Sequence, residues 1–162
     1  MLDNQLEKLY MKYYKELFLY AFSLCKDYHL AQDLASDTFY KAILSFDFSE
    51  SYIKYWLFRV CKNLFIAQVR RNKEYSDTEG LDNITSPKKN PLDKLIDSEE
   101  KKRIYQLVIG LPPSYREVII LYYYCDFTIK DITNATGLSE SNAKVLLYRA
   151  RKKLKIQLEV EK

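Results

Sequence analysis

Glycine and proline are scarce in this sequence of 162 residues, which holds 3 Gly and 4 Pro. β-Barrels, β-sandwiches and Gly-rich phosphate loops need many tight turns, so this scarcity argues against all three. Apolar residues make up 48% and charged residues 30% of the chain, which is typical of a globular protein. We therefore expect an all-α fold, and the length suits one large domain or two small ones.

The side chains that most often catalyse reactions or bind metals are also few. The chain has one histidine, His29, and three widely separated cysteines, Cys25, Cys61 and Cys125, without a C-x-x-C pair. This inventory predicts free thiols in a reducing cytosol and no zinc site. Because no nucleophile motif or phosphate loop is present, we also expect a protein that is not an enzyme and needs no cofactor.

Signals for export or membrane insertion are missing as well. The N-terminal segment carries acidic residues and lacks an apolar core, so no signal peptide is expected. No uninterrupted apolar run approaches the roughly 18 residues that a membrane span needs. These features predict a cytoplasmic protein with no membrane insertion of its own.

Positive charge, in contrast, is gathered near one end of the chain. The net charge is +4, and residues 141–158 contain six basic side chains and no acidic one, whereas residues 73–98 contain 4 basic and 6 acidic side chains. A local basic patch of this kind is typical of a nucleic-acid-binding surface. The simpler alternative is a basic amphipathic helix whose charged face is only solvated. The 15 tyrosines favour half-exposed surfaces that contact a partner.

Apolar residues recur with helical spacing over residues 5–27, 30–44 and 52–71, which predicts three helices with a loop at 45–51. On the third helix we expect the following residues to face the core: Trp56, Val60, Leu64 and Ala67. Residues 73–98 lose the periodicity and contain Gly, Pro and clustered polar residues, so they are predicted to form a flexible linker.

The rest of the chain predicts four further helices, over residues 98–109, 114–124, 128–136 and 139–158. Ser114 and Glu117 have the spacing of a capping box at the start of the second of these.

A short turn joins the last two predicted helices. Gly137 is placed to end one of them and Ser139 to cap the next. A short helix, a turn with glycine and a second helix form a helix-turn-helix motif, whose second helix enters the major groove of DNA. On that helix we expect a buried stripe of Ala143, Leu147, Ala150 and Leu154. The neighbouring face carries Lys144, Tyr148, Arg151 and Lys155.

With these motifs in order, the chain resembles a bacterial RNA polymerase sigma factor of the extracytoplasmic-function (ECF) type of the sigma-70 family. The segment LPPSYREVIILYYYCDFTIKDITNATGLSESNAKVLLYRARKKL of this chain resembles region 4 of the family. Region 2 of the family is similar to three segments of this chain: YYKELFLYA, AQDLASDTFYKA and YWLFRVCKNLFIAQVRR. The resemblance implies two small helical domains: sigma region 2, a helical bundle, at residues 1–72, and sigma region 4 at residues 99–162, with a linker at 73–98. It implies a protein that binds core RNA polymerase and directs promoter-specific initiation of transcription.

The resemblance also implies three sets of binding residues. The last helix would read the −35 promoter element through base edges and phosphates, using Ser141, Asn142, Lys144, Val145, Tyr148, Arg149, Arg151 and Lys152. The loop and third helix would recognise and melt the −10 element, with aromatic platforms for unpaired bases and charge for the backbone, using Phe46, Phe48, Tyr52, Lys54, Tyr55, Arg59, Lys62, Asn63, Arg70 and Arg71. The second helix would bind polymerase through Gln32, Asp33, Asp37, Thr38 and Phe39.

The alternative hypothesis is a helix-turn-helix DNA-binding transcription regulator that does not act as a sigma subunit. Such a regulator would not need the aromatic-rich loop or the acidic second helix of the first half. The resemblance further implies a cognate anti-sigma factor as a partner. Because Val145-Leu146 stand where the family commonly has Ser-Arg, no promoter sequence is carried over.

Overall fold

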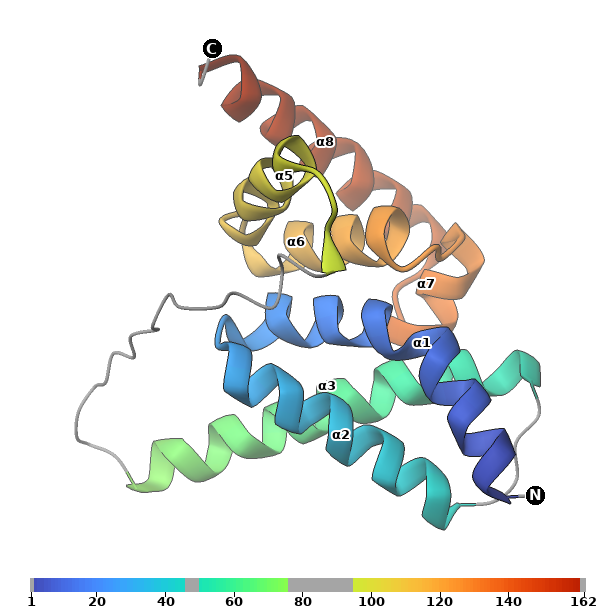
Figure 1. Cartoon of the computed structure of the whole chain (residues 1–162). Helices are drawn as coiled ribbons and strands as arrows, with labels where there is room; N and C mark the ends of the chain where they lie inside the picture. The colour runs from blue at the N-terminus through green and yellow to red at the C-terminus, as the bar shows by residue number, and fades with distance from the viewer. Residues whose placement is uncertain (1, 46–49, 76–94, 161–162) are drawn as a thin grey trace. The chain divides into compact units, whose positions relative to one another are not determined.

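The structure, a computed structural model, describes residues 2–45, 50–75 and 95–160 (Figure 1). These residues form α-helices and one π-helical turn with no strand among them, so the predicted all-α fold is confirmed. The chain divides into two compact units, Met1–Asn90 and Pro91–Lys162. The helices of the first unit are α1 (Leu2–Cys25), α2 (Tyr28–Leu44) and α3 (Glu50–Tyr75). Those of the second are α5 (Glu99–Ile109), α6 (Pro113–Ile119), the π-turn η1 (Ile120–Tyr124), α7 (Ile129–Thr136) and α8 (Glu140–Val160).

The first unit is a bundle in which α1, α2 and α3 each pack against the other two. All three helices contribute large or tightly fitted side chains to one core, among them Leu17, Phe18, Ala21, Ala31, Leu34, Ala35, Leu57, Phe58 and Cys61. Burying one side chain of the size of Leu or Phe stabilises a fold by about 1.5–3 kcal/mol, so this core holds the long helices together.

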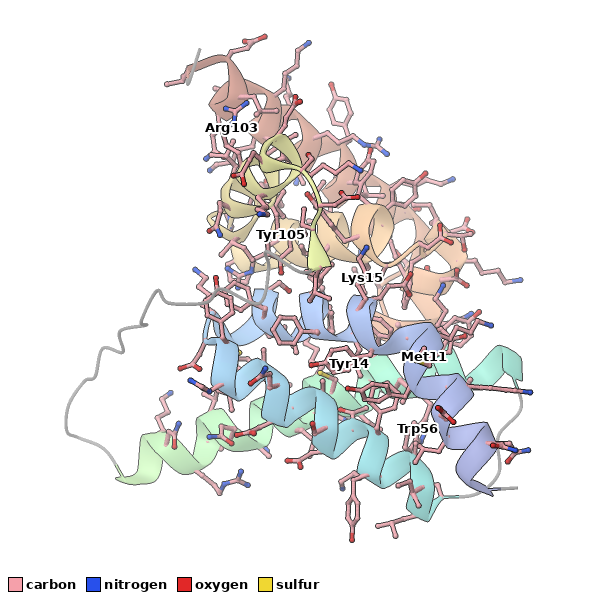
Figure 2. The ribbon with its side chains drawn as sticks, viewed as in Figure 1. Met11, Tyr14, Lys15, Trp56, Arg103 and Tyr105 are labelled. Atoms are coloured by element: carbon pink, nitrogen blue, oxygen red, sulfur yellow. The ribbon has the colours of Figure 1, made fainter. Side chains whose placement is uncertain are left out.

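The buried face of α3 differs from the prediction. Trp56, the start of the predicted stripe, is only half-buried (Figure 2), as are the other members of that stripe. The residues that enter the core are instead Ile53, Leu57, Phe58 and Cys61. Apolar residues occur on more than one side of α3, so periodicity alone allowed two faces. Packing against α1 and α2 selects the one that starts at Ile53.

The connection from α1 to α2 is short because two residues reverse the chain. Lys26 adopts a left-handed conformation with φ 60, and Asp27 caps α2 by accepting a hydrogen bond from the backbone N–H of Leu30 at 2.9 Å. A side-chain oxygen at this position satisfies one of the N–H groups that a helix start leaves without a partner.

The second unit is built around α8, which packs against α5, α6 and α7. Ser98 caps α5, as predicted for a helix starting near it, by accepting from the N–H of Lys101 at 3.0 Å. Tyr105 of α5 is fully buried (Figure 2), and its ring meets that of Tyr124 edge to face at 5.2 Å. Arg116 donates to the backbone oxygen of Ile109 at 3.2 Å, which ties α6 to the end of α5.

The start of α6 corrects one prediction. Ser114 does not cap the helix; Pro112 occupies the cap position without a side-chain bond, and Pro113 is the first helical residue. Proline suits that position because its fixed φ is already helical and its missing N–H would have no partner there. The predicted helix to Tyr124 is present, but its last five residues form η1, with an N–H to carbonyl bond from Cys125 to Ile120 at 3.1 Å.

No helix in the described ranges is long and apolar enough to cross a membrane. The predicted linker lies largely outside the described residues. At its start, α3 continues to Tyr75, three residues beyond the predicted domain end.

Candidate nucleic-acid interface

Two helices and a tight turn form the predicted helix-turn-helix motif. At its start, the Thr128 side chain accepts from the N–H of Asp131 at 3.0 Å, and the Asp131 carboxylate accepts from the N–H of Thr128 at 2.9 Å. This capping box satisfies two N–H groups of α7 reciprocally. Gly137 ends α7 with φ 83, a left-handed conformation that glycine adopts without steric cost.

The turn leads directly into α8. The N–H of Leu138 donates to the Thr136 hydroxyl at 3.1 Å, and Ser139 caps α8 by accepting from the N–H of Asn142 at 3.1 Å. Ala143, Leu147 and Ala150 are buried, as predicted, while Leu154 is half-buried. Small alanines let α8 approach its neighbours closely, so the opposite face of α8 is turned outward.

All residues predicted to read the −35 element are exposed on α8: Ser141, Asn142, Lys144, Val145, Tyr148, Arg149, Arg151 and Lys152. Two of them are an apolar and an aromatic side chain: Val145 is 42% exposed and Tyr148 is 62% exposed. The ammonium of Lys152 lies 5.8 Å from the centre of the Tyr148 ring. The face therefore combines cations with apolar surface, and the described part of α8 carries acidic residues only near its two ends.

A tyrosine outside the motif joins this face and was not predicted. Arg151 donates from Nε to the Tyr123 hydroxyl of η1 at 2.6 Å. The guanidinium carbon also lies 5.5 Å from the ring centres of Tyr122 and Tyr123. The two partners are 28 positions apart in the chain, so no local pattern could have joined them.

The residues predicted for the −10 element lie on or before α3. Phe46 and Phe48 are outside the described residues, and the backbone of Tyr52 is helical. The other members extend along α3: Lys54, Tyr55 and Lys62 are half-buried, whereas Arg59, Asn63, Arg70 and Arg71 are exposed. Residues that are four or seven positions apart share one side of a helix, so α3 brings Tyr55, Arg59 and Lys62 together.

The residues predicted to bind polymerase separate into two groups. Gln32, Asp33 and Asp37 are exposed on α2, and the two aspartates are one turn apart. Thr38 and Phe39 are buried, with 0% and 4% of their surface exposed. The Thr38 hydroxyl donates to the backbone oxygen of Leu34 at 2.7 Å. Both side chains belong to the core of the first unit, so the exposed part of the predicted polymerase-binding set is Gln32, Asp33 and Asp37.

The thiols are free, and none lies in a metal-binding cluster among the described residues. Burial raises the pKa of Cys61 to about 12 and that of Cys25 to about 11. Both thiols therefore stay protonated at neutral pH, whereas nucleophilic attack or metal binding would need the thiolate.

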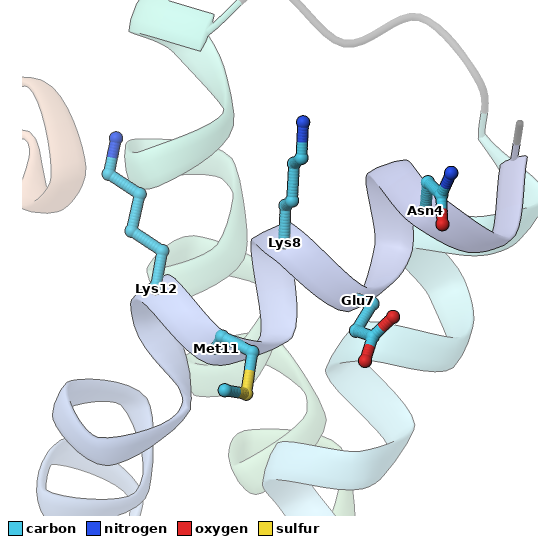
Figure 3. A pocket seen from close by; sticks show the side chains of 5 residues that line it. All are labelled: Asn4, Glu7, Lys8, Met11 and Lys12. Carbon is cyan, nitrogen blue, oxygen red and sulfur yellow. The ribbon is translucent and has the colours of Figure 1, made fainter.

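A shallow hollow on α1 is lined by Asn4, Glu7, Lys8, Met11 and Lys12 (Figure 3). All five side chains come from one helix, so the hollow is wide open and has no opposite wall. It cannot enclose a small molecule. The exposed helix faces remain the better candidates for a functional surface.

A helix-turn-helix motif with an outward basic helix is typical of a DNA-binding protein, and together with the three-helix bundle it agrees with the resemblance to the sigma-70 class. Residues 9–75 match the family model for Sigma-70 region 2, and residues 101–154 match that for Sigma-70, region 4. The chain belongs to the ECF RNA polymerase sigma factors.

Individual relatives agree along nearly the whole chain. The ECF RNA polymerase sigma factor SigM of Bacillus subtilis (strain 168) is 34% identical over 152 residues, and the match covers 93% of each chain. The RNA polymerase sigma factor YlaC of the same organism is 31% identical, with 94% of this chain and 91% of that one covered. Among solved structures, the sigma factor RpoE in complex with the anti-sigma factor NepR from Bartonella quintana has a TM-score of 0.74 at 27% identity, covering 96% of this chain and 98% of that one.

Proposed function

We propose that this sigma factor binds core RNA polymerase through α2, reads the −35 promoter element with α8, and recognises and melts the −10 element with α3 and the loop before it. The observation that carries the proposal is the outer face of α8, where all eight residues predicted for the −35 element are exposed. The protein then acts by binding in the cytoplasm and catalyses no reaction of its own.

Two groups of residues on α8 have different tasks. In helix-turn-helix proteins the first turns of the recognition helix reach base edges, so Ser141, Asn142, Lys144 and Val145 select the sequence. Residues further along hold phosphates, which fixes the orientation of the protein on the duplex. We assign this second task to Tyr148, Arg149, Arg151 and Lys152.

On α3, one side of the helix combines an aromatic ring with cations. Tyr55 can stack on an unpaired base, while Arg59 and Lys62 neutralise the backbone of the opened strand. Arg70 and Arg71 extend the positive charge toward the end of the helix. Phe46, Phe48 and Tyr52 complete the set of aromatic residues that the proposal assigns to melting.

On α2, the proposal assigns polymerase binding to Gln32, Asp33 and Asp37, whose exposed carboxylates suit a basic partner surface. Because RpoE was solved with its anti-sigma factor NepR, we also propose a cognate anti-sigma factor for this chain. The domains that carry these tasks are sigma region 2 at residues 1–72 and sigma region 4 at residues 99–162, with a linker at 73–98.

The first test combines core polymerase, free of other sigma factors, with the full-length protein on a pooled genomic template. Run-off transcription should give discrete new transcripts, and their start sites then supply promoter duplexes. If the protein binds duplex DNA but not core polymerase, the proposal is overturned in favour of a plain regulator.

Two variants test the assignment to helices. Lys144→Ala should weaken promoter binding by the holoenzyme about 10-fold and lower the salt dependence by about one counterion, whereas the control Lys153→Ala should change affinity less.

Asp37→Ala should weaken association with core polymerase and leave the sequence preference unchanged. Glu7→Ala removes the same charge type from an exposed position on α1 and serves as its control.

A further inference from the structure

The contact between η1 and α8 points to a role for Tyr123, a residue that lies outside α3 and α8, the two helices predicted to bind DNA. Tyr123 is 53% exposed, and its hydroxyl accepts the Nε hydrogen of Arg151 at 2.6 Å. We propose that Tyr123 and Arg151 together bind one phosphate group of the promoter backbone beside the −35 element. The inference rests on the proposed function of α8 and adds a DNA-contacting residue to it.

The hydrogen-bond inventory of the pair fits a phosphate. A tyrosine hydroxyl that accepts one bond keeps its own hydrogen for donation, and a guanidinium has five N–H donors, of which Nε–H is one. The Arg151 terminal nitrogens and the Tyr123 O–H can therefore both donate to oxygens of one anion. The pair offers donors and positive charge, which suit the acceptor oxygens of a phosphate. A guanine edge also presents two acceptors, but base edges are reached from the first turns of a recognition helix, and Arg151 lies further along α8.

The rings hold the guanidinium in place before DNA arrives. Arg151 lies 5.5 Å from the centres of both the Tyr122 and the Tyr123 ring, and these two rings meet edge to face at 5.0 Å. An arginine held by a hydroxyl and two neighbouring rings has less side-chain freedom left to lose, so less entropy is lost when it binds. A freely moving surface arginine would lose that freedom on binding.

The position along α8 places the pair at the flank of the groove contacts. Arg151 follows Ser141 by ten residues, which corresponds to about 15 Å along a helix. The first turns reach base edges, so a side chain that far along the helix lies at the level of the backbone flanking the major groove, which is about 12 Å wide. Residues 141–158 contain no acidic side chain that would neutralise Arg151 from within its own helix.

The test measures holoenzyme binding to a promoter duplex obtained from the run-off experiment. Tyr123→Phe keeps the ring and removes only the hydroxyl, so we expect a 3- to 10-fold loss of affinity, about one lost hydrogen bond, with an unchanged salt slope. Arg151→Ala should lower both the affinity and the salt slope, by about one counterion. Tyr115→Phe makes the same chemical change on α6 and should bind as the parent protein does.

A set of duplexes, each with one neutral methylphosphonate in place of a phosphate, identifies the contact. At one flanking position the methylphosphonate should lower the affinity of the parent protein, and it should lower that of Tyr123→Phe and of Arg151→Ala by a smaller factor. The double variant Tyr123→Phe/Arg151→Ala should bind little more weakly than Arg151→Ala alone. Sensitivity at different positions in the two variants, or unchanged binding by Tyr123→Phe, would overturn the inference. If the parent holoenzyme shows no preference for the promoter and Lys144→Ala has no effect, it is the proposed function that fails.

Discussion

The two units of this protein obtain their stability by different means. The first consists of helices of 24, 17 and 26 residues that share a core rich in large side chains. The second contains helices of only 11, 7 and 8 residues besides the longer α8. Each helix end leaves backbone N–H or C=O groups without a partner inside the helix. In a short helix these groups are a larger share of the total, so capping residues contribute more to its stability.

This difference explains where local signals occur. In the second unit, a capping box starts α7, a left-handed glycine ends it, and serine side chains cap α5 and α8. In the described part of the first unit, Asp27 caps α2, and aromatic rings such as those of Phe18 and Phe22 stack in the core. The comparison teaches that core size should control the first unit, and turn and cap residues the second.

The largest expected effect is a core truncation in the first unit. Leu57 is fully buried, so Leu57→Ala should destabilise that unit by about 2–5 kcal/mol, through lost burial and the cavity left behind. Trp56 is the only tryptophan of the chain, so its fluorescence during urea unfolding reports on the first unit.

Leu44→Ala is the control, because the same side chain is 62% exposed on α2. We expect it to change the unfolding free energy by less than about 0.5 kcal/mol. Equal effects of the two substitutions would show that core size does not set the stability of the first unit.

The same contrast explains which parts of the fold could be predicted. On α8 the buried residues Ala143, Leu147 and Ala150 follow one regular helical spacing and the cations lie on other faces, so the buried face and the exposed charges follow from the sequence. On α3 apolar residues surround more of the helix, so the choice of Leu57 and Phe58 over Val60 and Leu64 depends on the neighbouring helices.

Site residues were predictable for a related reason. Exposed charges on α8 follow directly from their place opposite Ala143 and Leu147. Thr38 was predicted among the polymerase contacts, but it lies in the core, where its hydroxyl donates to the Leu34 backbone oxygen. Tyr123 could not be predicted, since its partner Arg151 comes from a different helix.

The next largest effect is expected from alkaline pH, through the buried thiols of the first unit. A thiol ordinarily has a pKa of 9.0, and burial raises it to about 12 at Cys61 and about 11 at Cys25. Above pH 9 the unfolded chain therefore releases these protons while the folded chain retains them. Stability falls as pH rises from about 9 until the folded thiols ionise, by up to about 3 kcal/mol at pH 10 for both groups.

In the second unit, burial raises the pKa of Tyr124 from 10.0 to about 12, so this tyrosine adds a loss of stability that begins near pH 10. Amide hydrogen exchange of peptides from each unit, measured between pH 8 and pH 11 with correction for intrinsic rates, compares the two. The double variant Cys25→Ala/Cys61→Ala should have a flatter pH dependence in the first unit. If its dependence is as steep as that of the parent, the thiols are not the cause.

A smaller effect is expected at the turn of the second unit. Gly137→Ala places a Cβ at φ 83, where nothing lies within 4 Å of it, so the cost is conformational strain alone, about 1–2 kcal/mol. Gly110→Ala is a matched control, because Gly110 has φ −81 and its added Cβ would lie at an ordinary 3.5 Å from the Leu107 oxygen.

For Gly110→Ala we expect no loss, or a gain of up to about 1 kcal/mol from a less flexible unfolded chain. Hydrogen exchange of α7 and α8 measures both variants. A Gly137→Ala protein with unchanged protection would show that the left-handed turn does not limit the stability of this unit.

The smallest effect concerns the caps, and it tests the comparison most directly. Thr128 accepts the Asp131 N–H at 3.0 Å, whereas Ser114 makes no cap bond. Thr128→Ala should therefore destabilise the second unit by about 1 kcal/mol, and Ser114→Ala should be nearly neutral. Because a cap acts at one helix end, the loss of hydrogen-exchange protection should be greatest in the first turn of α7, with Trp56 fluorescence unchanged. Equal losses from the two substitutions would mean that hydroxyl groups stabilise this unit wherever they occur, and the difference between capped short helices and a packed long-helix core would no longer hold.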